Sequence, residues 1–188
     1  MRWCEKGDAL FDARHRFVIS FGASLPELGK TNALVRYIAG GWQLNGIVQK
    51  QTGFPLTVTE SVDVALQTLT NRPNATCDPN EGGAGTKDQW FNTSCFQRLT
   101  LAANAGQIGD AGRNTVRGPG FAKTDLSLFK NFDFAQNQRI QLRVEAFNLF
   151  DQTRFLQPGG NIGAPTTFGV ITAAEDGRIV QLGIKYQF

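Results

Sequence analysis

The residues of this chain that are best suited to covalent chemistry are three cysteines and a single histidine. Cys77 and Cys95 lie 18 positions apart in one polar stretch. A disulfide between them would stabilise the folded chain by about 3 kcal/mol through the loop entropy that it removes. We predict this disulfide for an oxidising compartment, with two unpaired thiols as the alternative. Cys4 is left over, and its expected partner is a cysteine upstream of this chain.

Metal binding and catalysis are both poorly supported. The chain has no Cys-x-x-Cys pair, and His15 is far from Cys77 and Cys95 in sequence, which disfavours a zinc site. His15 stands between two arginines without a serine or cysteine nucleophile motif, so we expect it to be an ordinary residue at the start of a strand. We predict that the chain is not an enzyme, and that it has no catalytic residues, no metal and no cofactor.

Two carboxylates, Asp125 and Glu145, could form the acid pair of a glycosidase. Both occupy polar positions of alternating segments that also place Lys123, Arg139 and Arg143 on the same side. Because alternate side chains of a strand share one face, these charges are expected to form a network on a wet surface. We favour that network over a catalytic pair.

The alternation is clearest at residues 138–149 and at the last eleven residues, 178–188. In the final stretch one face is apolar and the other is mostly polar; the apolar side comprises Val180, Leu182, Ile184, Tyr186 and Phe188. Such a period of two predicts β-strands with one greasy face.

Five strands are expected in all, near 14–24, 41–59, 123–134, 138–150 and 178–188. Residues 135–137 predict a tight turn, residues 25–29 end the first strand, and 30–40 is ambiguous, a possible extension of a turn. Two irregular segments, near 60–120 and 151–177, are rich in Asn, Gly, Thr and Pro. Loops of this length are uncommon in compact soluble domains but are usual outside outer-membrane barrels.

Composition excludes several classes of protein. No apolar run reaches the length of a transmembrane helix, and the net charge of +3 is scattered, so we expect no nucleic-acid partner. The first residues lack the apolar core of a secretory signal. Taken alone, the lack of a signal sequence indicates a cytoplasmic protein. Taken together with the predicted membrane strands, it favours the C-terminal piece of a longer exported chain.

The position of aromatic residues supports strands that cross a bilayer. One set is expected at the short-turn end: Trp42, Phe132, Phe134, Tyr186 and Phe188. A second set is expected towards the long loops: Phe54, Phe121, Phe147, Phe150 and Phe168. Two aromatic belts around an apolar band are typical of a membrane barrel.

The predicted fold is therefore all-β: part of an antiparallel up-and-down transmembrane β-barrel with two long external loops. The charges predicted to face its lumen are Asp125, Arg139, Arg143, Glu145 and Lys185. Five strands are too few to close a bilayer barrel, which needs about eight or more, so the missing strands lie upstream or come from other chains. The alternative is a soluble secreted β-sandwich that binds carbohydrate through its loops.

Several segments in a fixed order resemble the C-terminal barrel of TonB-dependent outer-membrane receptors. The subgroup they look most like is the Oar-like one, whose members often carry a carboxypeptidase-regulatory-like domain. The segments are Asp12-Ala-Arg-His-Arg-Phe17, Gly41-Trp-Gln-Leu-Asn-Gly46 with Gln51-Thr-Gly-Phe-Pro55, Asp125-Leu-Ser-Leu-Phe-Lys-Asn-Phe132 and Arg143-Val-Glu-Ala-Phe-Asn-Leu-Phe150.

The resemblance implies a location in the bacterial outer membrane, in a barrel of about 22 strands with a plugged lumen. It implies energy-dependent uptake of a scarce nutrient, whether siderophore, glycan or peptide. The implied partners are outer-membrane lipid, upstream barrel strands, and the TonB complex through a missing N-terminal part. The barrel-assembly machinery would read the last strand through Tyr186 and Phe188.

Overall fold

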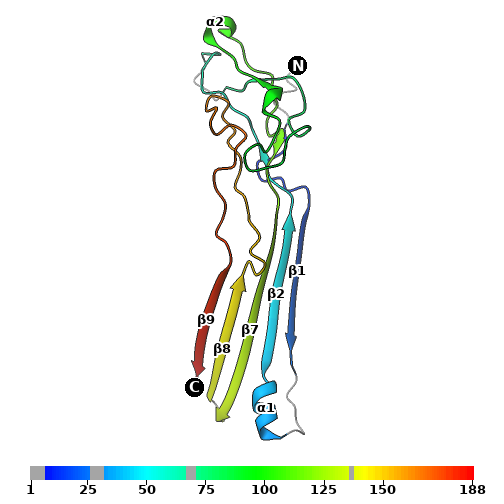
Figure 1. Ribbon diagram of the computed structural model, residues 1–188, viewed down its shortest axis with the longest axis vertical. Helices are drawn as coiled ribbons and strands as arrows, with labels where there is room; N and C mark the ends of the chain where they lie inside the picture. Colours follow the sequence, from blue (N-terminus) through cyan, green and yellow to red (C-terminus); the bar gives the residue numbers. More distant parts are fainter. Residues whose placement is uncertain (1–6, 26–31, 67–70, 136–137) are drawn as a thin grey trace. The chain divides into compact units, whose positions relative to one another are not determined.

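The computed structural model describes residues 7–25, 32–66, 71–135 and 138–188 (Figure 1). The chain divides into two compact units. We name the first the loop unit; it consists of Met1–His15, Gln51–Phe121 and Arg154–Glu175. We name the second the sheet unit; it consists of Arg16–Lys50, Ala122–Thr153 and Asp176–Phe188.

The sheet unit is built on one five-stranded sheet whose strands follow one another in chain order. They are β1 (Arg16–Ser24), β2 (Trp42–Gln51), β7 (Phe121–Ala135), β8 (Gln138–Phe147) and β9 (Ile179–Gln187). The arrows alternate in direction across the sheet (Figure 1), and the pairings of β7 with β8 and of β8 with β9 are antiparallel. The prediction of an all-β, up-and-down antiparallel fold is confirmed. In the described residues the sheet is open, with β1 and β9 at its edges.

Strand β2 ends earlier than the predicted boundary near residue 59. A Cβ on Gly53 would lie 1.8 Å from the carbonyl oxygen of Gly118, so the backbone leaves the ladder at a close crossing that only glycine permits. Pro55, which has no N–H to donate, then begins the two-residue β3 (Pro55–Leu56), which pairs with β6 (Val116–Arg117).

Strand β8 also ends before its predicted limit near residue 150. Asn148 has a φ of 53°, a left-handed conformation that stops a strand. Its N–H donates to the Asp125 carboxylate over 2.8 Å, and its side chain exchanges hydrogen bonds with the main chain of Gln152. Hydrogen bonds of the Asp125 and Asn148 side chains therefore stabilise the turn that ends β8.

Between β1 and β2 the chain forms a short helix, α1 (Ala33–Ala39), where the sequence indicated only an extension of a turn. Gly41, with a φ of +70°, reverses the chain into β2, as glycine commonly does after a helix. The predicted end of β1 lies largely outside the described residues, as does most of the predicted turn at 135–137.

The loop unit contains short elements around a small aromatic core. These are β3 and β6, the pair β4 (Asn74–Ala75) and β5 (Phe96–Gln97), the 3-10 helix η2 (Thr93–Cys95), and α2 (Leu101–Asn104). Phe91, Phe96 and Phe168 meet edge to face with ring centroids 5.3 to 6.1 Å apart. Since Phe168 comes from the second irregular segment, the two predicted loops fold together on one core.

None of the helices in the described part of the chain is long and apolar enough to cross a membrane.

Candidate functional site

One side of the five-stranded sheet is apolar and exposed. We name it the apolar face; register and packing place on it Phe17, Ile19 and Phe21 of β1, Trp42, Leu44 and Val48 of β2, Leu126, Leu128 and Phe132 of β7, Ile140, Leu142 and Val144 of β8, and Val180, Leu182, Ile184 and Tyr186 of β9. Leu182 and Ile184 are 76% and 78% exposed. An exposed apolar surface of this extent indicates contact with an apolar environment.

The opposite side of the sheet is the polar face. In register, Asp133 lies beside Arg139, Gln141 lies between Asn131 and Lys185, and Glu145 lies between Ser127 and Gln181. The five charges predicted to face a lumen, Asp125, Arg139, Arg143, Glu145 and Lys185, therefore share this face. Which medium they face stays a prediction.

The polar side chains of this face contact one another along the strands. Gln141 Nε2 donates to Asn131 Oδ1 over 2.8 Å, and Arg143 Nε donates to Gln141 Oε1 over 2.6 Å. The Arg143 guanidinium also lies 5.1 Å from the centroid of the Phe129 ring. Arg139 pairs with Asp133. The result is a hydrogen-bonded ladder suited to a wet surface.

Asp125, one member of the possible catalytic pair, is held by structural contacts. Its carboxylate lies 3.1 Å from Lys123 Nζ and accepts the N–H of Asn148. These contacts order the end of β8, and this structural role accounts for the carboxylate without a catalytic one.

The five aromatic residues predicted for the short-turn end gather at that end of the sheet. Tyr186 stacks between Phe134 and Phe188, with ring centroids 6.3 and 5.7 Å away. Trp42 begins β2, and Phe132 is aligned with Tyr186 through Ile140. Their position at a membrane interface follows from the sequence prediction and is not measured by these contacts.

The predicted second belt is wrong for two of its members. Phe168 packs against Phe91 and Phe96 in the core of the loop unit. Phe147 is aligned with Ile179 and falls on the polar face, with Lys123 Nζ 5.9 Å from its ring. Strand register and local packing therefore decide where these two rings lie, and they do not join an aromatic belt.

Lys130 is a cation on the apolar face that sequence reasoning missed. It is aligned with Leu142 and is only 5% exposed. Its ammonium lies 5.5 Å from the Trp42 ring and 5.0 Å from the Phe132 ring, and it donates to the carbonyl of Gly40. The break in the alternation of β7 was the signal that could have identified it.

The loop unit contains the predicted disulfide between Cys77 and Cys95, with Cα atoms 5.0 Å apart. Cys4 lies outside the described residues. The His15 side chain is exposed, and the His15 main chain exchanges hydrogen bonds with Thr52. No cluster of three or more His, Cys, Asp or Glu side chains suited to a metal occurs among the described residues.

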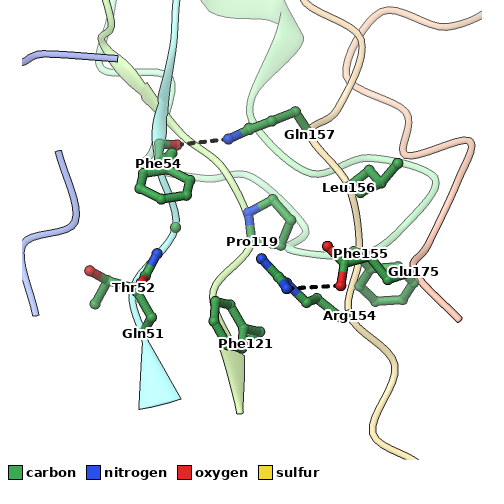
Figure 2. Close-up of a pocket in the computed structure, with 11 residues that line it drawn as sticks. Gln51, Thr52, Phe54, Pro119, Phe121, Arg154, Phe155, Leu156, Gln157 and Glu175 are labelled. Atoms are coloured by element: carbon green, nitrogen blue, oxygen red, sulfur yellow. Dashed lines mark hydrogen bonds and ion pairs between the residues drawn. The ribbon is translucent and has the colours of Figure 1, made fainter. Parts of the chain in front are cut away.

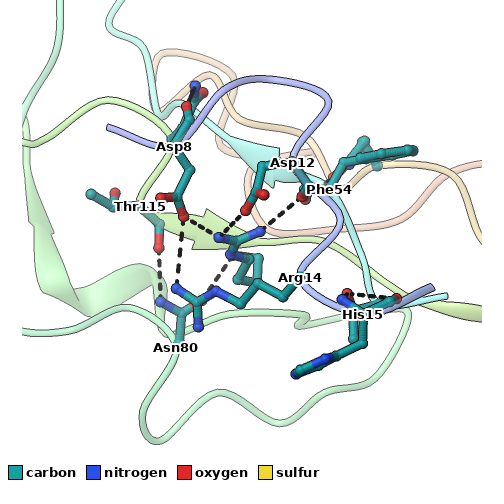
Figure 3. A network of polar contacts seen from close by, with 11 residues as sticks. Asp8, Asp12, Arg14, His15, Phe54, Asn80 and Thr115 are labelled. Carbon is teal, nitrogen blue, oxygen red and sulfur yellow. Dashed lines mark hydrogen bonds and ion pairs between the residues drawn. The ribbon is translucent and has the colours of Figure 1, made fainter. Parts of the chain in front are cut away.

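A charged network holds residues 7–15 on the loop unit (Figure 3). Arg117 pairs with Asp8 and Asp12, and Arg14 lies 3.7 Å from Asp8. Asn80 joins the network by accepting the N–H of Arg117 over 2.8 Å. The cavity beside these residues is about 570 Å³, and Asp8, Arg14 and Arg117 of its lining are paired with one another.

A second pocket of the loop unit lies between Phe54, Pro119 and Phe121 on one side and the segment 154–157 on the other (Figure 2). Arg154 donates to Glu175 over 2.8 Å and lies 3.9 Å from the centroid of the Phe121 ring. The volume is about 100 Å³, well below the several hundred Å³ of typical ligand pockets. It is best understood as a packing defect between two segments.

Glu60 is the one acidic side chain among the described residues that is fully buried in an ion pair. Arg98 donates to both of its oxygens over 2.9 and 3.0 Å. Burial by itself raises the pKa of this carboxyl. The Arg98 hydrogen bonds and charge, with the N–H groups of Ser61 and Val62, outweigh burial and hold the pKa below its ordinary value of 4.5.

Aromatic residues in a long loop can contact a ligand or pack the loop on itself. Trp90 and Phe91 pack the loop on itself. Phe91 is 1% exposed, and Trp90 Nε1 donates to the Arg117 carbonyl over 2.7 Å.

The family model described as "Outer membrane beta barrel domain" matches residues 1–181. No curated protein and no solved structure matches the chain significantly.

Proposed function

Because the chain belongs to the outer membrane beta barrel domain family and is located in the bacterial outer membrane, we propose that it forms the C-terminal part of a TonB-dependent transporter barrel. In this proposal the substrate is a scarce nutrient of the siderophore, glycan or peptide class. In the same proposal the TonB complex acts through a plug upstream of these residues.

The observation that supports the proposal best is the contrast between the two faces of the sheet. Leu182 and Ile184 are more than three-quarters exposed on the apolar face, whereas Arg143 and Gln141 are hydrogen-bonded on the polar face. A membrane barrel needs this combination of an outer surface in lipid and an inner surface in water. A soluble sandwich would have to cover the apolar face with a second sheet. The other sheets of the described residues are pairs of two-residue strands.

The open edges of the sheet support a larger barrel. Unpaired N–H and C=O groups at β1 and β9 would cost several kcal/mol each in lipid. Five strands are below the minimum of about eight for a closed bilayer barrel. We therefore expect further strands, from upstream residues or from other chains, to pair with both edges.

The loop unit favours a transporter of the TonB-dependent kind over a simple pore. Its residues form a core around Phe91, Phe96 and Phe168, with a disulfide and a buried ion pair. A folded, disulfide-bonded unit of this kind suits a protein that recognises a particular solute. In the proposed orientation, residues 7–15 and both long segments are outside the cell and Phe188 is at the periplasmic end.

The test is electrical and needs no knowledge of the substrate. The full-length protein is purified from outer membranes and inserted into planar lipid bilayers. A plugged barrel is expected to conduct no ions at first and to open reversibly when urea displaces its plug. A variant that lacks the plug region is the control, and should conduct at once.

A steady, open conductance of the intact protein in the absence of urea would contradict the proposal and indicate a porin. Uptake in the native host offers a second measurement: nutrient-limited growth that depends on this protein should also require TonB. Growth that survives loss of TonB would exclude energy coupling.

A further inference from the structure

The helix α1 lies against the apolar face of the sheet. Ile38 of α1 lines a hollow together with Trp42, Leu128 and Phe132, and the Tyr37 ring lies 5.2 Å from the Phe132 ring. Leu128 and Phe132 both belong to the apolar face. The helix is therefore on the side of the sheet that contacts lipid.

Four apolar side chains of α1 are exposed, including the two that touch the sheet. Leu34 is 66% exposed, Ile38 61%, Tyr37 52% and Val35 46%. A helix of seven residues is too short to be stable by its own hydrogen bonds in water. Four adjacent apolar side chains of this kind indicate that something apolar covers them.

The C-terminal end of α1 is fastened by two donors from the sheet. Trp42 Nε1 donates to the carbonyl of Ile38 over 2.9 Å, and the Lys130 ammonium donates to the carbonyl of Gly40. The last carbonyls of a helix lack partners within the helix and carry partial negative charge, so a cation is favourable there. These bonds explain why a lysine is retained on the apolar face.

We propose that α1 is an interfacial helix that lies within one leaflet of the bilayer, with Leu34, Val35 and Ile38 among phospholipid acyl chains. The exposed side of α1 continues the apolar face, whose environment is lipid, so lipid is the occupant that requires no additional partner. Tyr37 and Trp42 stand where aromatic side chains meet headgroups. The leaflet is the periplasmic one, which rests on the proposed orientation; the contact with lipid does not.

The experiment places a nitroxide at residue 34 of the full-length protein in phospholipid vesicles. The variant is Leu34→Cys in a background in which Cys4 and every cysteine upstream of this chain are replaced by serine. The Cys77–Cys95 disulfide is kept, which leaves one thiol to label. Collision with oxygen reports lipid, and collision with a soluble nickel chelate reports water. Leu182→Cys on the apolar face is the lipid control, and Lys87→Cys in the loop unit is the water control.

A label at residue 34 is expected to give an oxygen-to-nickel collision ratio close to that of residue 182 and several-fold above that of residue 87. A ratio like that of residue 87 would overturn the proposal. Protection from both reagents would overturn it too, because a protein rather than lipid would then cover α1. If the label at residue 182 were itself in water, the apolar face would not contact lipid and the proposed function would be contradicted. That result differs from one in which only residue 34 is in water.

A second measurement uses the unsubstituted protein, so that it does not depend on how a variant folds. Phospholipids with a photoactivatable diazirine on the acyl chain are expected to label α1 as well as β9. Adducts on β9 without adducts on α1 would overturn the proposal.

Discussion

The ring of Phe21 in β1 occupies the space above Gly46 in β2, where an added Cβ would lie 2.3 Å from the ring. Gly46 is buried by this contact, although it stands in the middle of a strand. An aromatic ring that covers a glycine of the neighbouring strand fixes the register between the two strands. The fit explains why a glycine interrupts the otherwise large side chains on the apolar side of β2.

Replacement of Gly46 by valine should displace the Phe21 ring and weaken the pairing of β1 with β2. The expected cost is about 1 kcal/mol, the upper end for one cross-strand pair. Urea unfolding of the full-length protein in vesicles measures it. Gly183→Ala is the matched control, because a Cβ there meets its nearest atom at an ordinary 3.7 Å. Equal losses for the two variants would show that the ring contact does not matter.

A charge on the apolar face should be much less well tolerated than the loss of a charge on the polar face. Leu142→Arg would put a guanidinium in lipid beside Lys130, its partner in register, and should cost about 2–4 kcal/mol near the middle of the bilayer. Arg143→Leu, one residue away, removes a hydrogen bond to Gln141 and should cost about 1 kcal/mol.

The measurement for this pair is the yield of folded, heat-modifiable protein in the outer membrane. Because the two positions are adjacent in β8, expression level and strand position are matched. Similar yields for the two variants would contradict the assignment of the faces.

Loss of the disulfide should loosen the loop unit without harming the sheet. Cys95 is fully buried in the core of the loop unit, so Cys77→Ala removes the bridge and leaves that core filled. The expected loss is about 3 kcal/mol of local stability. Limited proteolysis measures it: cleavage within 60–120 should become faster, while the fragment that spans β7 and β8 should survive. Unchanged cleavage of 60–120 would mean that the bridge is not formed in the mature protein.

Lys130→Met should free α1 while leaving the sheet intact. The variant removes the hydrogen bond to Gly40 and replaces a lipid-side cation by a flexible apolar chain of similar length. Amide hydrogen exchange in α1 should rise about tenfold, which corresponds to the loss of one hydrogen bond from a charged donor. Exchange in β8 should be unchanged. Lys185→Met on the polar face is the control, and an equal effect on α1 would refute the fastening role of Lys130.

The strands were predictable because apolar and polar residues alternate along each of them, and the register of the sheet keeps each kind on its own face. Leu182 alternates with Gln181 and Gly183 in the sequence, and the three remain on their expected faces in the sheet. The Cys77–Cys95 bridge was expected because both cysteines lie in one predicted loop of an exported protein, and the structure contains it. Local patterns of this kind survive because each strand pairs with its neighbour in chain order.

The loop unit was not predictable, since its core residues recur at no regular interval. Phe91, Phe96 and Phe168 come from distant positions, and long-range contacts decide that they meet. The same reason moved Phe168 out of the expected aromatic belt. Helix α1 was missed because seven residues are too few to show a helical period, and because hydrogen bonds from Lys130 and Trp42 of the sheet stabilise its end.

The stability of the loop unit should fall in acid because of Glu60. The pKa of this carboxyl is lower in the folded chain than its ordinary value of 4.5, so the unfolded chain binds the proton more tightly. Its contribution to stability is therefore fully present above about pH 4.5 and is lost as the pH falls through the lower, folded pKa. Trp90 fluorescence between pH 7 and pH 3 follows the change, because Trp90 packs against the core of the loop unit.

Arg98→Met provides the decisive comparison. Without the guanidinium, only the N–H groups of Ser61 and Val62 oppose the effect of burial on the Glu60 carboxyl, so its pKa should rise. The acid transition should therefore move to higher pH, and the loop unit should be less stable at neutral pH. Lys87→Met is the control, since Lys87 and its neighbour Asp88 are both exposed and lie 4.0 Å apart, a pair of little energetic value. An acid transition at the same pH in all three proteins would show that the bonds between Arg98 and Glu60 do not govern the acid stability of the loop unit.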